Sequence, residues 1–262
     1  MTGSEDPATN LKRMGLLEDD AVPLAEAALL LAWLDHQTVD LAPYRDHLKE
    51  IANATAARLG PMRHPQAAAA AMAEIISNGY GYFGDSVTYD DPQNSDMIRV
   101  IDRRRGLPVA LGIIYLETAH RLGLPASGLN APGHFVIAIG QGETAVIADP
   151  FNGGVMLNPE RSDSGRPELG AISRRDVLLR LLNNQRSRAK EPARILSLCE
   201  RMILLAPKRA DLWLDVAKAS ETVGKLRNAA GAFQAVMKIA GSESQLGREA
   251  AIALHAVKRR LN

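Results

Sequence analysis

A histidine and an aspartate flank one predicted β-hairpin. His134 begins the apolar run 134–139, and Asp149 ends the run 144–149. Short β-rich runs around a glycine-containing turn are typical of a hairpin. If residues 141–142 form the turn, His134 lies directly opposite Asp149, with Cβ atoms roughly 4.5–5.5 Å apart. A carboxylate there orients one imidazole nitrogen and favours its charged form, so the pair forms two-thirds of a Cys–His–Asp triad.

The spacing of apolar residues predicts helices around this hairpin. Pro108 suits the first position of a helix that runs to about Leu122, where Gly123 and Pro125 end it. Ser95 is placed to cap a short helix near residues 97–101. Residues 79–95 are rich in Tyr and Gly, which is typical of a shaped loop. Further helices are predicted over residues 23–34, 44–59 and 65–76.

The last third of the chain is predicted to be helical. Residues 158–172 are polar and rich in Gly, Pro and Ser, which indicates a surface loop or a domain boundary. We expect a flexible segment over 1–20, a first domain over 21–172 and a helical domain over 173–262. Several residues within 210–240 have spacings like those of a tetratricopeptide unit of about 34 residues, namely Trp213, Ala217, Gly224, Ala229 and Phe233.

Five short motifs resemble, in the same order, those of the bacterial SirB-type transglutaminase-like proteins, which also carry C-terminal tetratricopeptide repeats. The resemblance covers residues 25–240 and implies an α+β fold. It implies a transglutaminase-like (papain-like) core with a helical lead-in and a small antiparallel sheet carrying His134 and Asp149, followed by an all-α tetratricopeptide-like region. The motifs are Tyr89–Ser95, Arg105–Leu111, Arg121–Leu124, Pro132–Phe135 and Asp149–Gly154.

The resemblance also implies where a nucleophile would lie. In active members of the superfamily a cysteine begins the central helix, where the helix dipole and the neighbouring imidazolium stabilise the thiolate. The matching place here is near Pro108, but no Cys, Ser or Thr occurs between Ser95 and Thr118. The single cysteine, Cys199, lies among apolar residues at helical spacing, so we expect it to be a buried core residue. Acyl transfer by the usual thiol mechanism is therefore not expected.

Three roles remain open for His134 and Asp149. They form a buried hydrogen-bonded pair that locks the hairpin, they belong to a retained cleft for a ligand or peptide, or His134 acts as a general base for water. We predict a vestigial dyad in a non-catalytic protein-interaction or regulatory module. The alternative is a hydrolase or amidase that uses the dyad with water, and a third possibility is a scaffold without a cleft.

Other polar and aromatic residues are candidates for a binding surface near the dyad. The turn at Asn152 and Gly153 is either structural or an anion-binding nest. The run 103–105 is either a solvated turn or a contact for an anionic partner, and the Tyr-rich loop either walls a groove or packs on itself. The binding candidates are Tyr89, Asn94, Arg105, Phe135, Asn152 and Gly153.

Bulk composition narrows the classes of partner. The 31 Lys and Arg residues against 30 Asp and Glu give a net charge of +1, so no global field favours nucleic acid or acidic lipid. The polar N-terminus is unlike a signal peptide, and the longest apolar stretch, Ala25–Leu34, is too short for a bilayer. One cysteine fits a reducing compartment. We expect a cytoplasmic protein with a protein or peptide partner, no direct nucleic-acid or membrane binding, no cofactor and no metal site.

Overall fold

The computed structural model describes residues 6–61, 64–131, 134–157 and 170–261. The chain divides into two compact units, one formed by Asp19–Leu181 and the other by Met1–Glu18 together with Leu182–Asn262. The first unit contains the sheet and the second is helical. The expected boundary at residue 172 therefore lies too early, because helix α7 (Arg174–Arg188) contributes its first half to the sheet-containing unit.

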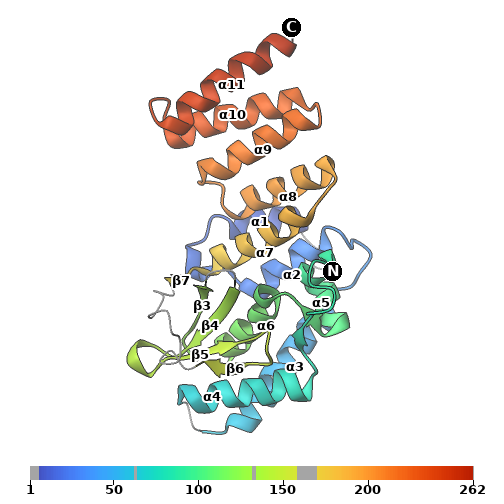
Figure 1. Cartoon of the computed structure of the whole chain (residues 1–262), viewed down its shortest axis with the longest axis vertical. Helices are drawn as coiled ribbons and strands as arrows, with labels where there is room; N and C mark the ends of the chain where they lie inside the picture. The colour runs from blue at the N-terminus through green and yellow to red at the C-terminus, as the bar shows by residue number, and fades with distance from the viewer. Residues whose placement is uncertain (1–5, 62–63, 132–133, 158–169, 262) are drawn as a thin grey trace. The chain divides into compact units, whose positions relative to one another are not determined.

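A five-stranded antiparallel sheet with the order β6-β5-β4-β3-β7 forms the centre of the first unit (Figure 1). This confirms the predicted small antiparallel sheet. Its last strand, β7, pairs with β3 and occupies residues that were expected to be loop, while residues 158–169 of that expected loop lie outside the described part of the chain. The strands are β3 (Ala126–Ala131), β4 (His134–Ile139), β5 (Val146–Asp149), β6 (Val155–Leu157) and β7 (Gly170–Ile172).

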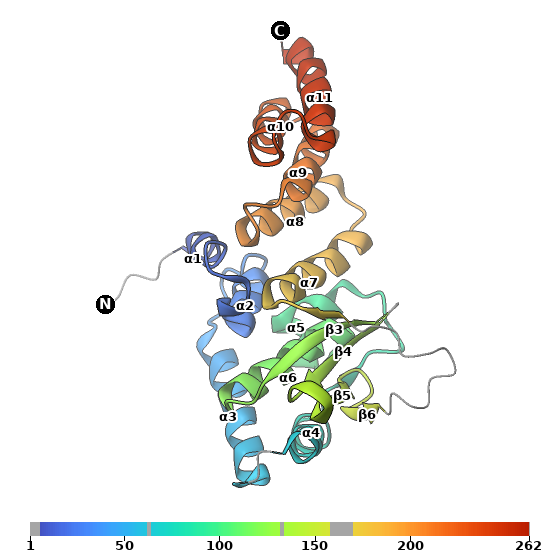
Figure 2. The same cartoon turned by 90° about the vertical axis from the view of Figure 1, so that its left-hand side faces the viewer.

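Helices that the sequence predicts surround this sheet. Helix α6 (Pro108–Arg121) begins at Pro108 as expected and lies against β3 and β4 (Figures 1 and 2). A short parallel pair, β1 (Phe83–Gly84) and β2 (Arg105–Gly106), joins the Tyr-rich loop to the segment before α6. The other helical elements of this unit before α7 are η1 (Asp19–Ala21), α2 (Leu24–Trp33), α3 (Ala42–Leu59), α4 (Pro65–Met72), the π-helical η2 (Ala73–Gly79), η3 (Pro92–Ser95), α5 (Met97–Arg103) and η4 (Gly142–Thr144).

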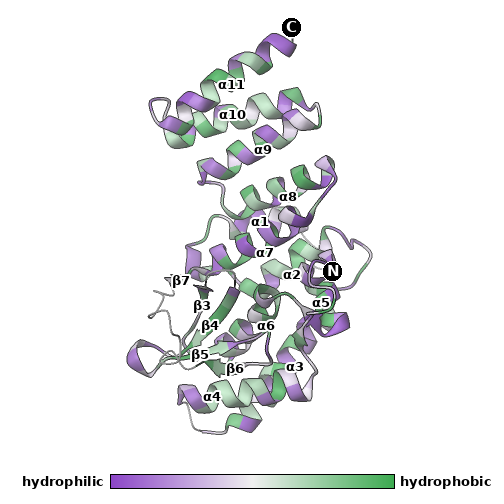
Figure 3. Ribbon diagram, in the orientation of Figure 1, coloured by the Kyte–Doolittle hydropathy of each residue, from purple (hydrophilic) through white to green (hydrophobic). Residues whose placement is uncertain are grey.

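Two glycines allow α6 and β3 to pack directly against the Phe135 ring. The Phe135 ring is 1% exposed, and a Cβ at Gly112 of α6 would lie 2.3 Å from its Cε1. A Cβ at Gly128 of β3 would lie 2.8 Å from its Cζ. Most of α6 and all of β4 except its first residue are apolar (Figure 3). Burial of these surfaces supplies the main driving force that holds α6 on the sheet.

The hairpin register differs from the predicted one by two residues. Ile139 pairs with Val146 and Ile137 with Ala148, so residues 140–145 form a six-residue connection that contains η4. Continuing this register places Asp149 opposite Val136, diagonal to His134. Because side chains alternate with a period of two, a shift of two residues keeps both side chains on the same face.

The cap of α5 also differs from the predicted one. The Asp96 carboxylate accepts hydrogen bonds from the backbone N–H groups of Ile98 and Arg99, at 3.0 and 3.2 Å. Ser95 instead ends η3 and is fully buried, with its hydroxyl donating to the Pro92 carbonyl. Asp and Ser are equally good N-caps, so residue type alone does not distinguish these two neighbours.

The helical unit contains α1 (Pro7–Met14), the end of α7, α8 (Pro192–Leu205), α9 (Ala210–Thr222), α10 (Leu226–Ala240) and α11 (Gln245–Leu261). Residues 7–14, expected to be flexible, are helical, and Leu11 is completely buried. Cys199 is 2% exposed and belongs to the apolar core of α8–α11, which confirms the expected core position. Burial also raises the pKa of its thiol, which disfavours the reactive thiolate. No helix in the described residues is long and apolar enough to cross a membrane.

Candidate functional site

The His134 and Asp149 side chains form a direct contact at one end of β4 and β5. His134 Nε2 lies 2.9 Å from Asp149 Oδ2. The Asp149 side chain is 6% exposed, whereas 32% of the His134 side chain is exposed. No hydrogen-bond partner of His134 Nδ1 is found among the described residues. The carboxylate therefore orients the ring through Nε2, and Nδ1 is left for solvent or a ligand.

The loop after β5 provides the other partners of Asp149. Oδ1 accepts from the backbone N–H of Phe151 at 3.0 Å, and Oδ2 accepts from Asn152 Nδ2 at 2.7 Å. Burial alone would raise the pKa of Asp149, but the hydrogen bonds from His134 and Asn152 outweigh it, and the pKa is lowered from its ordinary value of 3.8. Asp149 is consequently ionised at neutral pH and is satisfied without any added ligand.

Two glycines shape this loop, which supports the tight-turn interpretation of residues 152–154. Gly153 and Gly154 have φ values of 72° and 78°, which favour glycine. A Cβ at Gly154 would also lie 2.5 Å from the hydroxyl oxygen of Tyr115 in α6. The same hydroxyl lies 2.9 Å from Ser77 Oγ, so Tyr115 of α6 packs between Ser77 and the loop that follows Asp149. Burial, together with the negative charge of Asp149, raises the pKa of Tyr115 to about 12.

The N-terminus of α6, where the superfamily resemblance places a nucleophile, is apolar. Leu107 and Val109 are each 1% exposed and Pro108 is also buried. No side chain caps this helix end. These residues carry no group that can attack a carbonyl, so the dyad has no thiol or hydroxyl nucleophile at that position.

Aromatic residues and an arginine surround the imidazole. The Phe151 ring stands edge-on to His134 at a centroid distance of 6.2 Å and to Tyr89 at 5.8 Å. Arg180 of α7 donates from Nη2 to the His134 carbonyl at 2.9 Å, and its guanidinium lies over the Phe135 ring. Tyr89 is 38% exposed. Together these side chains form the dyad face, which we define as Tyr89, His134, Asp149, Phe151, Asn152 and Arg180.

Of the predicted site residues, the structure brings together His134, Asp149, Asn152 and, through Phe151, Tyr89. Sequence reasoning missed Phe151 and Arg180. Phe151 lies two residues after Asp149, within the motif Asp149–Gly154. Arg180 is the one charged residue within the apolar run 177–182, but the predicted boundary at residue 172 placed it in the helical domain.

Three predicted binding residues serve the fold instead. Asn94 is completely buried, its amide donates to the Thr88 carbonyl at 2.6 Å, and its own carbonyl accepts from the Leu107 N–H at the start of α6. Phe135 is buried between α6 and β3. Arg105 is exposed, but it donates to the Gly81 carbonyl at 2.8 Å and lies over the Phe83 ring. The expectation that Asn94 and Phe135 contact a ligand is therefore not compatible with their burial.

Comparison with known proteins agrees with this architecture. A family model described as the transglutaminase-like superfamily matches residues 42–183. The chain belongs to this superfamily. The family match spans every element that positions His134 and Asp149, from α3 to the first half of α7.

Relatives of this transglutaminase-like chain include a UPF0162 protein of Xylella fastidiosa strain Temecula1, which is 32% identical over 65% of this chain and 61% of the relative. The chain thus matches less than two-thirds of that relative's length. A UPF0162 protein of Vibrio cholerae is 30% identical over 52% of this chain and 51% of its own. Human F-box only protein 21 is 30% identical over 31% of this chain and 13% of its own length.

Among solved structures, menin covers 92% of this chain at 12% sequence identity with a TM-score of 0.46. Its structure is described as revealing the binding site for the Mixed Lineage Leukemia protein. No conclusion about the transglutaminase-like chain is drawn from a similarity of this extent.

We call the sheet-containing unit, Asp19–Leu181, the transglutaminase-like unit. Its arginine run, residues 103–105, is not a solvated turn. Arg103 pairs with Asp85 at 2.9 Å and also donates to Asn94. Arg104 adopts the left-handed conformation (φ 58°) and donates from Nη1 to the Tyr82 hydroxyl and to His47 Nε2. Left-handed backbone is uncommon for a non-glycine residue. The guanidinium therefore belongs to a partly buried cluster of Arg104, Tyr82 and His47, of which Tyr82 is fully buried.

This cluster predicts a pH-dependent stability. Burial, with the charge of Arg104 adding to it, lowers the pKa of His47 from 6.5 to about 4. Between these values the unfolded chain binds a proton that the folded protein does not, so the free energy of unfolding decreases as the pH falls from 6.5 to 4, by about 2 kcal/mol for this group. We expect His47→Gln, which keeps an acceptor for Arg104 but does not titrate, to show a smaller decrease.

The measurement is urea unfolding at pH 7 and pH 4.5. Trp33 lies in the transglutaminase-like unit and Trp213 in the helical unit, so a Trp213→Phe background restricts the fluorescence to the first unit. The same loss of stability in wild type and His47→Gln would contradict the assignment of this pH dependence to His47.

No group of three or more His, Cys, Asp or Glu side chains that could hold a metal ion is found within residues 6–61, 64–131, 134–157 and 170–261.

Proposed function

We propose that this transglutaminase-like protein is non-catalytic and that its dyad face binds a protein or peptide partner. The observation that carries the proposal is the combination of an intact, partly open His134–Asp149 pair with buried apolar residues at the N-terminus of α6. A triad without its nucleophile keeps the imidazole as a hydrogen-bonding group. Aromatic residues beside it, Tyr89 and Phe151, supply contact area of the kind that dominates protein interfaces.

The proposal extends to the helical unit and to the location of the protein. We assign helices α8–α11 to the tetratricopeptide type, in line with the SirB-type resemblance, because Ala217, Ala229 and Phe233 all lie in their shared core. Helical repeats of this type present surfaces for peptides. The chain would act as a regulator in the cytoplasm, where a lone buried thiol is kept reduced.

Photo-crosslinking tests the dyad face. Val87 is 92% exposed and lies two residues from Tyr89, so p-benzoylphenylalanine at position 87 disturbs little and reports on molecules at this face. We expect one partner to crosslink in the native cells, and His134→Gln to reduce its yield at least about fivefold, because loss of a desolvated hydrogen bond costs about 1–2 kcal/mol. Asp46 on α3, which is exposed and belongs to neither the dyad face nor helices α8–α11, is the control position.

The absence of a crosslinked partner at position 87, or a yield that His134→Gln leaves unchanged, would contradict binding through the dyad face. A partner captured equally from position 46 would mean that position 87 reports no specific contact.

A second candidate function is hydrolysis with water in place of the cysteine. It is favoured by the ionised Asp149 and by the His134 Nδ1 atom, which has no partner among the described residues. These features suit a general base. Hydrolysis of a peptide-amide library by the purified protein, abolished in His134→Gln, would favour this candidate over the non-catalytic one.

A further inference from the structure

A cavity of about 300 Å³ lies at the end of the sheet away from the dyad. Pro125, Ser127 and Gln141 line it, beside the end of the β3–β4 pair where Ala126 faces Ile139. His134 begins β4 at the opposite end, five residues or about 17 Å of extended strand away. The cavity is therefore separate from the dyad face.

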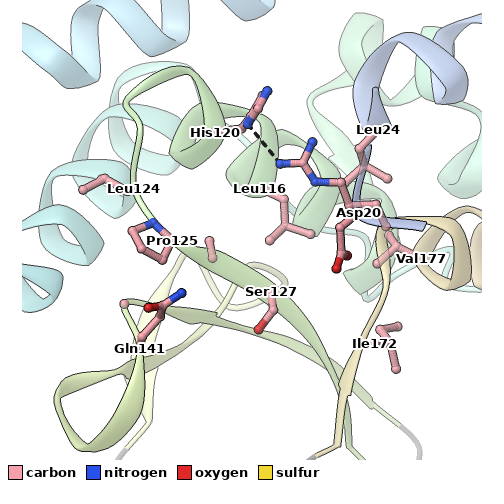
Figure 4. A pocket seen from close by; sticks show the side chains of 13 residues that line it. Asp20, Leu24, Leu116, His120, Leu124, Pro125, Ser127, Gln141, Ile172 and Val177 are labelled. Carbon is pink, nitrogen blue, oxygen red and sulfur yellow. Dashed lines mark hydrogen bonds between the residues drawn. The ribbon is translucent and has the colours of Figure 1, made fainter. Parts of the chain in front are cut away.

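Part of the wall of this cavity is aliphatic. Leu24 of α2, Leu116 of α6 and Val177 of α7 line it and are 2%, 7% and 1% exposed. Leu124 and Ile172 add further aliphatic surface (Figure 4). A volume near 300 Å³ is at the lower end of the range for small-molecule sites, and the wall combines these aliphatic side chains with polar ones.

Two opposite charges face the cavity without pairing with each other. Asp20 of η1 and Arg174 at the start of α7 both line it. The neighbouring residues Asp19 and Arg175 form an ion pair at 2.6 Å, which ties η1 to the first turn of α7 and so brings Asp20 and Arg174 to the same opening. No ion pair or hydrogen bond of the Asp20 carboxylate is found among the described residues.

His120 orients the arginine. Arg174 Nη2 donates to His120 Nδ1 at 2.9 Å, the bond drawn dashed in Figure 4. A guanidinium N–H can only donate, so His120 Nδ1 is the acceptor in this contact. That bond uses one of the five N–H donors of Arg174, and within the described chain the others have no partner. Ser127 and Gln141 supply further hydrogen-bonding groups (Figure 4).

We propose that this cavity binds a free α-amino acid with an aliphatic side chain. The carboxylate would pair with Arg174, the ammonium with Asp20, and the side chain would pack on Leu24, Leu116 and Val177. Arginine suits carboxylates because its planar fork donates two parallel hydrogen bonds. A purely anionic ligand would leave Asp20 unpaired next to it, and a purely cationic one would face Arg174, so the zwitterion is the ligand class that satisfies both charges.

Isothermal titration calorimetry of the full chain with L-leucine tests the proposal. We expect one binding site, and binding at least about tenfold weaker for leucinamide, for N-acetyl-L-leucine and for glycine, because each lacks one of the three recognised groups. Arg174→Gln and Asp20→Asn should each weaken the binding of L-leucine by a similar factor. Ser127→Phe, which fills the cavity, should abolish it.

Matched controls are Arg58→Gln and Asp46→Asn, the same changes on the exposed surface of α3. They should bind L-leucine as wild type does, and a circular dichroism melt verifies that each variant is folded. The proposal is overturned if L-leucine fails to bind at millimolar concentration, if leucinamide or N-acetyl-L-leucine binds as tightly, or if folded Arg174→Gln binds like wild type.

Discussion

Replacing Gly112 with alanine is expected to destabilise the transglutaminase-like unit by about 2–3 kcal/mol. The added Cβ would lie 2.3 Å from Cε1 of Phe135, and the ring cannot retreat because it is buried and lies close to Gly128 on β3. Alanine is the better helix former by about 1 kcal/mol, so an exposed glycine in a helix would give the opposite sign. The packing of Phe135 therefore decides the outcome.

Gly231 of α10 provides the matched control. A Cβ there meets nothing within 4 Å, so Gly231→Ala is expected to stabilise the helical unit by about 0.5–1 kcal/mol. Denaturant unfolding followed by Trp33 fluorescence in a Trp213→Phe background reports on Gly112→Ala. Unfolding followed by Trp213 in a Trp33→Phe background reports on Gly231→Ala. A stabilising effect of Gly112→Ala would show that α6 does not approach β4 as closely as described.

Removing the two members of the dyad is expected to have unequal effects. Asp149→Ala should cost about 3 kcal/mol, because it leaves the Phe151 N–H, the Asn152 amide and the imidazole without their buried acceptor. His134→Ala should cost about 1 kcal/mol, because the imidazole is one-third exposed and Asp149 keeps its other donors. The inequality follows from the number of hydrogen bonds that each side chain makes.

Urea unfolding of both variants in the Trp213→Phe background measures this difference. Equal costs would favour the scaffold interpretation, in which the pair exists only to lock the hairpin. If His134→Ala is nearly as stable as wild type but loses the partner crosslinked at position 87, the imidazole serves binding. Asp149→Asn, which keeps one oxygen acceptor, should be less destabilising than Asp149→Ala.

The contribution of Asp149 should also depend on pH in a defined direction. Its pKa is lowered from 3.8 by hydrogen bonds that outweigh the effect of burial. A group whose folded pKa is depressed stabilises the protein above its unfolded pKa and loses this contribution as the pH falls through the folded value. The stability difference between wild type and Asp149→Asn should therefore be constant from pH 7 to about pH 5 and shrink below about pH 4. This pH range lies below the range from 6.5 to about 4 in which His47 changes the stability.

The sequence by itself determined the features that depend on local physical chemistry. Short apolar, β-rich runs around a glycine-containing turn predicted β4 and β5, and Pro108 marked the first residue of α6, because strand propensity and proline geometry act over a few residues. The residue types also sufficed to show that no thiol or hydroxyl exists between Ser95 and Thr118. The order of the five motifs sufficed to predict the transglutaminase-like superfamily, which the family match confirms.

Only the tertiary structure decided which groups meet. The hairpin connection proved to be six residues long, so Asp149 is diagonal to His134 rather than opposite it, and alternation of side chains kept the pair together. Asn94 was a binding candidate but is buried, with its carbonyl accepting from the N–H of Leu107 before α6. Arg180 reaches the His134 carbonyl from α7, which the sequence placed wholly in the helical domain although its first half belongs to the sheet-containing unit. The cavity between Asp20 and Arg174 joins segments 154 residues apart in the chain. Burial and long-range pairing depend on how all segments pack, and no local pattern in the sequence contains that information.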